Sequence, residues 1–163
     1  MNLHSHSPSP PPPLCSALPP LAAPAPQATD IRETLSLQDF SVHKNIVAGT
    51  TDAKVDEMSF QLVGSREEGT FGVVCKAAAA EGADEIVYGT SLTYDCNGDK
   101  DHHYYFNVVK VEKDAFTLNV FREVTFGWGY QAQVEVPTYC HAGGNNSMAC
   151  AQVGGDVTVA MHP

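Results

Sequence analysis

Apolar and polar residues alternate along several stretches of the chain after residue 30. Met58, Phe60 and Leu62 are separated by polar residues, and the same alternation recurs at 116–120, 130–136 and 157–161. Successive side chains of a strand point to opposite faces of the sheet, so this pattern predicts half-buried antiparallel strands. Four further stretches are candidate strands: 34–42, 70–78, 86–95 and 103–112.

Turn-forming residues separate these stretches. Clusters that contain glycine lie at 64–69, 97–99 and 127–129, and the second also holds asparagine and aspartate. Only 77–81 has a helix-forming composition, and it is too short to form a helix alone. About eight evenly spaced strands predict an all-β fold, a single antiparallel β-barrel or closed β-sandwich of about 8–11 strands. Closure is expected because it removes the exposed edges of a flat sheet.

The composition of the chain changes sharply near residue 30. Residues 1–29 have no charged or aromatic residue and hold nine of the eleven prolines, so we expect a disordered leader there and one β-domain over 30–163. Short apolar runs at 14–18 and 21–23 end in small residues, as in a signal peptide, but the basic start is missing and prolines 8–13 break a helix. A degenerate signal peptide is the favoured interpretation, and a disordered cytosolic tail is the alternative.

The net charge of the chain disfavours some classes of binding partner. The chain has 9 Lys and Arg against 19 Asp and Glu, a formal net charge of −10. Such a surface repels phosphate backbones and anionic lipids, so we expect neither nucleic acid nor a membrane as a partner. No run of 18 or more apolar residues occurs, which disfavours a membrane-spanning segment.

Four of the five cysteines fall in the β-domain: Cys75, Cys96, Cys140 and Cys150, while Cys15 lies in the leader. An even, widely spaced set without a Cys-x-x-Cys pair predicts two disulfides and a secreted, extracellular protein. Four cysteines allow three pairings, and spacing alone does not choose among them.

One segment partly matches a calcium-binding loop. Asp95, Asn97 and Asp99 fit its first ligand positions, but Lys100 stands where glycine is needed and Phe106 where a bidentate glutamate is needed. We therefore expect a polar hairpin turn here and no metal site.

The sequence gives little support for a catalytic site. His102 and His103 are neighbours, and adjacent strand residues point to opposite faces, which disfavours a shared metal ion. A disulfide-bonded Cys140 cannot act as a nucleophile with His141, and the chain has no hydrolase elbow, zinc-protease motif or nucleotide-binding loop. A non-enzyme without cofactors is favoured, and a secreted metal-dependent hydrolase using His102 and His103 is the alternative.

Two residues are candidates for recognition and modification. Trp128 lies between Gly127 and Gly129, and an aromatic residue in a loop can serve binding. Asn145 begins an Asn-x-Ser glycosylation tripeptide inside the expected Cys140–Cys150 loop, which agrees with secretion.

The sequence near the C-terminus resembles a known family. Residues 136–145 read Val-Pro-Thr-Tyr-Cys-His-Ala-Gly-Gly-Asn, and Cys150 and an alternating strand follow. This segment is similar to the C-terminal signature of the Alternaria major allergen family, small secreted fungal β-barrel proteins that include plant elicitors and effectors. The segment 21–26 is similar to that family's region around signal cleavage. The resemblance covers residues 31–163 and is most specific in the last thirty.

The resemblance implies a closed antiparallel barrel with Cys75 paired to Cys96 and Cys140 to Cys150. It also implies a non-catalytic elicitor or effector that binds host defence proteins of the thaumatin-like class or small plant phenolics. Some family members carry a further cysteine near the mature N-terminus that links two subunits. This chain has none between residue 30 and Cys75, so any homodimer is expected to be non-covalent. A structural protein of the cell wall or spore surface is another alternative.

Overall fold

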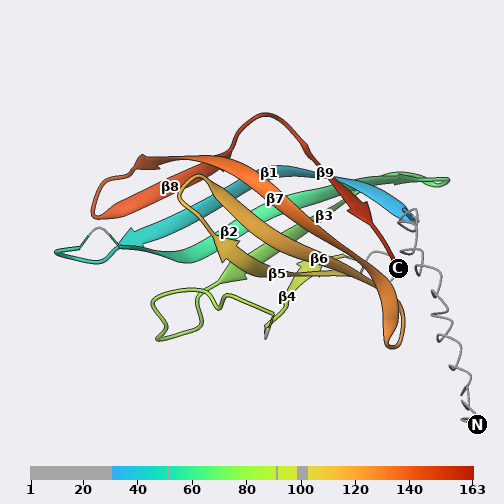
Figure 1. Cartoon of the computed structure of the whole chain (residues 1–163), viewed down its shortest axis with the longest axis horizontal. Coiled ribbons are helices and arrows are strands. Elements are labelled where there is room, and N and C mark those ends of the chain that lie inside the picture. The colour runs from blue at the N-terminus through green and yellow to red at the C-terminus, as the bar shows by residue number, and fades with distance from the viewer. Residues whose placement is uncertain (1–30, 51, 91, 99–102) are drawn as a thin grey trace, which may run out of the picture.

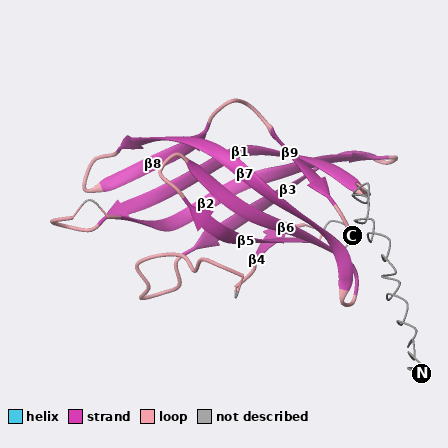
Figure 2. Cartoon of the chain, viewed as in Figure 1, coloured by secondary structure: helices cyan, strands magenta, loops and turns pink. Residues whose placement is uncertain are grey.

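The computed structural model describes residues 31–50, 52–90, 92–98 and 103–163. The predicted leader at 1–29 lies outside the described residues. Within the described part every regular element is a strand, as Figure 2 shows, and no helix there could span a membrane. The strands are β1 (Glu33–Ile46), β2 (Ala53–Arg66), β3 (Gly69–Ala78), β4 (Tyr94–Asn97), β5 (Tyr104–Val111), β6 (Ala115–Thr125), β7 (Trp128–Ala142), β8 (Ser147–Gln152) and β9 (Val157–Met161).

The strands close into a barrel. Each of β1 to β7 pairs antiparallel with the next strand, and β8 pairs back onto β1, so eight strands form a closed ring (Figure 1). The ninth strand is extra: β9 pairs with residues 33–37 of β1, and β8 pairs with residues 41–45. Asp39, with φ 52°, lies at the break in register between the two halves of β1. The predicted closed all-β fold is confirmed.

Alternation along the strands fills the barrel interior. The largest fully buried side chains include Phe40, Tyr104, Phe106, Phe116, Leu35, Leu37, Met58 and Leu62. Aromatic rings contact one another across the barrel, with Phe60 and Phe106 centroids 4.8 Å apart and Phe40 and Phe116 centroids 5.3 Å apart. Burial of each such side chain stabilises the fold by about 1.5–3 kcal/mol, so these inward faces dominate the stability of the barrel.

One predicted strand is largely wrong. The ranges 34–42, 70–78 and 103–112 fall on β1, β3 and β5, but of 86–95 only Tyr94 and Asp95 belong to a strand. Ile86 is buried and its N–H donates to the Val55 carbonyl at 2.8 Å, so this apolar residue anchors a loop against β2. A buried apolar residue in a loop can therefore imitate the apolar positions of a strand in the sequence.

The segment from Cys140 to Cys150 is a hairpin and not the expected loop. β7 and β8 pair directly through Cys140 and Cys150, and only 143–146 form the turn. The small residues Ala149 and Ala151 on β8 gave no clear alternation in the sequence. Disulfides join Cys75 to Cys96 and Cys140 to Cys150, each across two paired strands, which confirms the pairing that the resemblance implied.

The barrel has two different ends. One end, at the right of Figure 1, holds the β6–β7 hairpin, and we call it the Trp128 end. Glu33, Arg66 and Arg122 meet at this end. The opposite end, at the left of Figure 1, holds the end of β1 and the β7–β8 hairpin, and we call it the Lys44 end. Lys44, near the end of β1, is buried with its Nζ 4.9 Å from the Phe116 ring centroid.

Candidate functional site

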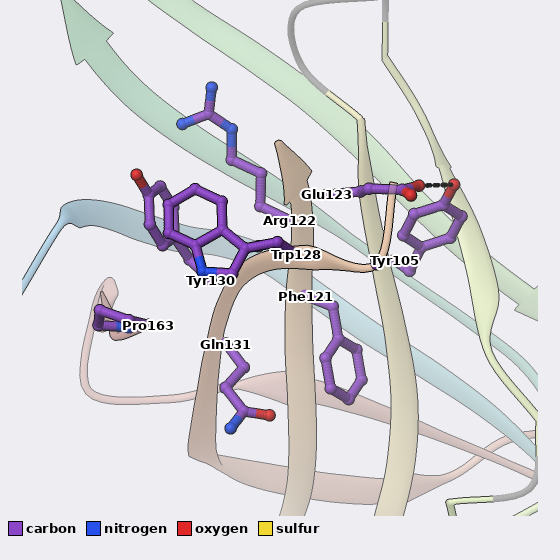
Figure 3. Close-up of a pocket in the computed structure, with 10 residues that line it drawn as sticks. Tyr105, Phe121, Arg122, Glu123, Trp128, Tyr130, Gln131 and Pro163 are labelled. Carbon is purple, nitrogen blue, oxygen red and sulfur yellow. Dashed lines mark hydrogen bonds between the residues drawn. The ribbon is translucent and has the colours of Figure 1, made fainter. Parts of the chain in front are cut away.

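A groove of about 420 Å³ lies at the Trp128 end, along the β6–β7 hairpin. Its side-chain walls, drawn in Figure 3, are Tyr105, Phe121, Arg122, Glu123, Trp128, Tyr130, Gln131 and Pro163, with Gly127 and Gly129 in its backbone. Of the grooves described in the structure it has the most aromatic lining. We therefore treat it as the candidate functional site.

Two glycines shape this hairpin. Gly127, with φ 75°, takes the left-handed conformation in the turn. A Cβ on Gly129 would lie 2.0 Å from the Arg122 carbonyl oxygen, so only glycine lets β7 approach β6 this closely. The register of β6 shifts just beyond this point, between Glu123 and Thr125. The tight approach and the bulge together place Trp128 at the rim of the groove, 52% exposed.

One wall of the groove is aromatic. The rings of Trp128 and Tyr130 meet edge to face, with centroids 5.4 Å apart and planes at 70°. The Arg122 guanidinium carbon lies 5.9 Å from the Tyr130 ring centroid. Flat π-surfaces of this kind favour contact with another planar ring.

A partly buried ion-pair network contacts that wall through Arg122. Glu33 Oε1 accepts hydrogen bonds from Arg66 Nη2 and Arg122 Nη1, both at 3.0 Å. Arg66 Nη2 also lies 3.4 Å from the Tyr104 hydroxyl, and burial together with Glu33 raises the pKa of Tyr104 above its ordinary value. The network joins β1, β2, β5 and β6, and it commits the Arg122 charge to Glu33.

The opposite wall is polar. The Tyr105 hydroxyl lies 3.5 Å from Glu123 Oε2, the contact dashed in Figure 3, and 3.0 Å from His103 Nδ1. On its other side the imidazole faces Asp95, with Nε2 and Oδ1 3.6 Å apart. Burial, then the charges of Glu123 and Asp95, raise the pKa of Tyr105, so its hydroxyl keeps its proton at neutral pH.

The structure brings two of the predicted site residues to this groove or beside it. Trp128 lines the groove and His103 supports its polar wall. His102 and residues 99–101 of the calcium-like segment lie outside the described residues. Among the residues the structure does describe, no group of three or more His, Cys, Asp or Glu is arranged to hold a metal ion.

Cys75 and Cys96 join β3 to β4, and four further predicted residues lie at the Lys44 end. Cys140 is bonded to Cys150, and His141 is exposed on the outer face of β7. Asn145 is exposed in the turn between β7 and β8, with φ 56°. None of these contributes to the groove.

Sequence reasoning missed most of the groove. Tyr105, Phe121 and Glu123 are in strands, where an aromatic residue is expected in the core. Their parity could have identified them, because Tyr105 follows the buried Tyr104 and Phe121 follows the buried Val120, so both point outward. The pairing of β5 with β6, which places Tyr105 opposite Phe121, was not visible in the sequence.

Comparison with known proteins agrees with the fold. The family model of Alternaria alternata allergen 1 matches residues 37–150. The crystal structure of Alternaria alternata allergen Alt a 1 superposes with a TM-score of 0.59 at 22% identity, covering 85% of this chain and 95% of that chain. Another crystal structure of the Alternaria alternata major allergen Alt a 1 gives a TM-score of 0.58 at 21% identity, covering 80% and 93%. No curated protein matches the chain. Since the family model spans more than half of its residues, the chain belongs to the Alternaria alternata allergen 1 family.

Proposed function

We propose that this protein is a secreted elicitor or effector without a reaction of its own, and that it binds a small planar phenolic ligand in the groove beside Trp128. The observation that carries the proposal is the groove itself, which combines the Trp128 and Tyr130 rings with the polar pair Tyr105 and Glu123. A phenol has a flat ring for the first wall and hydroxyl groups for the second. Small-molecule sites commonly join apolar walls with a few polar groups in this way.

Trp128 gives a direct test because it is the only tryptophan in the chain. Titration with 4-methylcatechol, with excitation selective for tryptophan, should change the fluorescence of Trp128 in a saturable manner. Trp128→Ala, followed by calorimetry, should weaken binding about fivefold, because a stacking contact of about 1 kcal/mol is lost.

Tyr139→Ala is the matched control, since Tyr139 is also an exposed aromatic of β7 but lies away from the groove. It should bind 4-methylcatechol as the wild type does. Absence of any saturable change at Trp128 would exclude the groove as the phenol site.

A host protein is the second candidate partner. Phe126 at the tip of the β6–β7 hairpin is fully exposed and Val124 is 42% exposed, next to the groove. Exposed aromatic residues of this kind often anchor protein interfaces. A purified thaumatin-like plant protein should bind the wild type in a surface assay, and Phe126→Ser should reduce that binding; equal binding by both would remove Phe126 from the interface.

Elicitor activity is tested on leaves. Infiltration of the purified protein should cause cell death or a defence-gene response, and Trp128→Ala should reduce it if the groove carries the activity. A folded protein that causes no response would contradict the elicitor role and would favour a structural protein of the wall or spore surface.

Secretion is tested through Asn145. Its place in an exposed turn leaves room for a glycan. Protein collected from the medium of the producing fungus should lose mass on treatment with an N-glycosidase, and Asn145→Gln should abolish that loss. N-terminal sequencing of the same protein should show that residues 1–29 are absent; Met1 on extracellular protein would contradict the cleaved leader.

A further inference from the structure

The polar wall of the groove offers acceptors and negative charge. Tyr105 stands between His103 and Glu123, and Asp95 lies beyond His103, so two carboxylates flank one hydroxyl. Glu123 is exposed and lines the groove directly. A ligand that reaches this wall therefore meets a carboxylate that can accept a hydrogen bond from it.

The positive charge of Arg122 does not cancel the negative charge of this wall. Arg122 lines the groove, but its Nη1 donates to Glu33 Oε1 at 3.0 Å, and its side chain is only 18% exposed. Its guanidinium also lies over the Tyr104 and Tyr130 rings, 5.9 Å from each centroid. An anionic ligand would have to compete with Glu33 for Arg122 while facing Glu123, in a protein of net charge −10.

The aromatic wall of the groove determines which ring a ligand needs. Trp128 and Tyr130 offer faces for a planar ring, and they lie across the groove from Tyr105 and Glu123 (Figure 3). Because Trp128 and Glu123 line the same groove, a ligand whose ring contacts Trp128 can extend a substituent to Glu123. That substituent binds well only if it carries a hydrogen-bond donor.

From this arrangement we infer that the groove selects aromatic ligands that donate a hydrogen bond and carry no negative charge, and that Glu123 and Tyr105 make the selection. Glu123 accepts from the ligand and repels ligand carboxylates. Tyr105 and His103 hold Glu123 in place, which makes Tyr105 a positioning residue as well as part of the wall. The inference rests on the proposed function, since it names the ligands that the same groove accepts and rejects.

The test compares two ligands that share a ring and two hydroxyl groups. 4-Methylcatechol is neutral at pH 7, and 3,4-dihydroxybenzoate carries a carboxylate in place of the methyl group. Titrations of the full chain, followed at Trp128 and by calorimetry, should show 4-methylcatechol binding roughly tenfold more tightly, the factor that one like-charge repulsion across a few ångströms produces.

Substitution of the selecting residue should remove the preference. Glu123→Gln keeps the shape of the side chain and removes its charge, so the two dissociation constants should converge to within about threefold. Tyr105→Phe should weaken 4-methylcatechol binding severalfold without reversing the preference. Glu135→Gln is the matched control, an exposed glutamate of β7 outside the groove, and should leave both constants unchanged.

The outcomes separate the two proposals. Equal or tighter binding of 3,4-dihydroxybenzoate by the wild type, or a preference that survives Glu123→Gln, would overturn the selection by charge while leaving the phenol site intact. Failure of both ligands to perturb Trp128 would overturn the phenol site itself and the selection with it.

Discussion

The two ends of the barrel hold partly or fully buried charges in different ways. At the Trp128 end, Glu33 is shared between Arg66 and Arg122, and three strands are joined by charge-assisted hydrogen bonds. At the Lys44 end, a single lysine lies over the Phe116 ring, and burial lowers its pKa despite the attraction of Asp114. The Trp128 end compensates its charges with ion pairs, whereas the Lys44 end buries a lysine against an aromatic ring.

The two ends also differ in whether they leave a groove open to a ligand. The Lys44 end is bound by the Cys140–Cys150 disulfide across β7 and β8, and Lys44 itself is only 5% exposed. The Trp128 end keeps a groove open above its ion pairs, with Trp128 half-exposed. We therefore expect changes at the Lys44 end to alter stability alone, and changes at the Trp128 end to alter stability and binding together.

Among the changes that separate the two ends, removal of the Cys140–Cys150 disulfide should have the largest effect on stability. Replacing both cysteines with alanine frees the unfolded chain from a crosslink between residues 10 apart in sequence, which costs about 3 kcal/mol of unfolding free energy on the loop-entropy account. Urea unfolding measures this loss. Binding of 4-methylcatechol should not change, and a binding defect in the folded variant would show that the two ends are coupled.

Glu33→Gln should have the next largest effect. It leaves Arg66 and Arg122 without the carboxylate between them, in a site where the Glu33 side chain is only 11% exposed. Removing one partner of a buried charge pair costs up to several kcal/mol, and the partial exposure of both arginines reduces the expected loss to about 2 kcal/mol.

Asp84→Asn is the control for Glu33→Gln. Asp84 pairs with Lys54 at 3.3 Å, but its side chain is 83% exposed, so its loss should cost less than about 0.5 kcal/mol.

Glu33→Gln should also change ligand binding, because Arg122 is then released toward the groove and 3,4-dihydroxybenzoate should bind more tightly. Unchanged binding of that ligand would contradict the role of Glu33 in holding Arg122.

The sequence predicted the barrel better than it predicted the groove. Alternation such as Phe116, Leu118 and Val120 reports burial on one face, and burial decides the fold. The groove instead depends on which outward residues meet across strands, as Tyr105 and Phe121 do. The sequence singled out Trp128 because its neighbouring glycines mark a turn, but nothing in the alternation links it to residues of β5.

The network at the Trp128 end was equally hidden. Glu33, Arg66 and Arg122 are far apart in the sequence, and each alone resembles an ordinary surface charge. Only the closure of β1 against β2 and the return of β6 to the same end bring them together. Charge pairing across a barrel is a property of topology, and periodicity within single strands does not contain it.

The smallest expected effect concerns the charge enclosed at the other end. Lys44→Met keeps the length of the side chain and removes the amine. Folding a charged lysine into this site costs desolvation free energy, which lowers the pKa of Lys44 and is partly offset by the Phe116 ring and Asp114. The free energies of unfolding of wild type and variant should therefore differ by less than about 1 kcal/mol, with the variant the more stable.

The pH dependence of that difference is the sharper measurement. The folded-state pKa of Lys44 is lowered from 10.5, so as pH rises toward 10.5 the folded protein releases this proton before the unfolded chain does. The unfolded state then binds more protons, and this group's contribution to wild-type stability increases with pH. The advantage of Lys44→Met should consequently shrink between neutral and alkaline pH in paired urea titrations. An advantage that stays constant, or grows, would mean that the Phe116 ring and Asp114 compensate the buried charge fully. Lys44 would then resemble Arg66 and Arg122, whose charges are compensated by their ion pairs with Glu33.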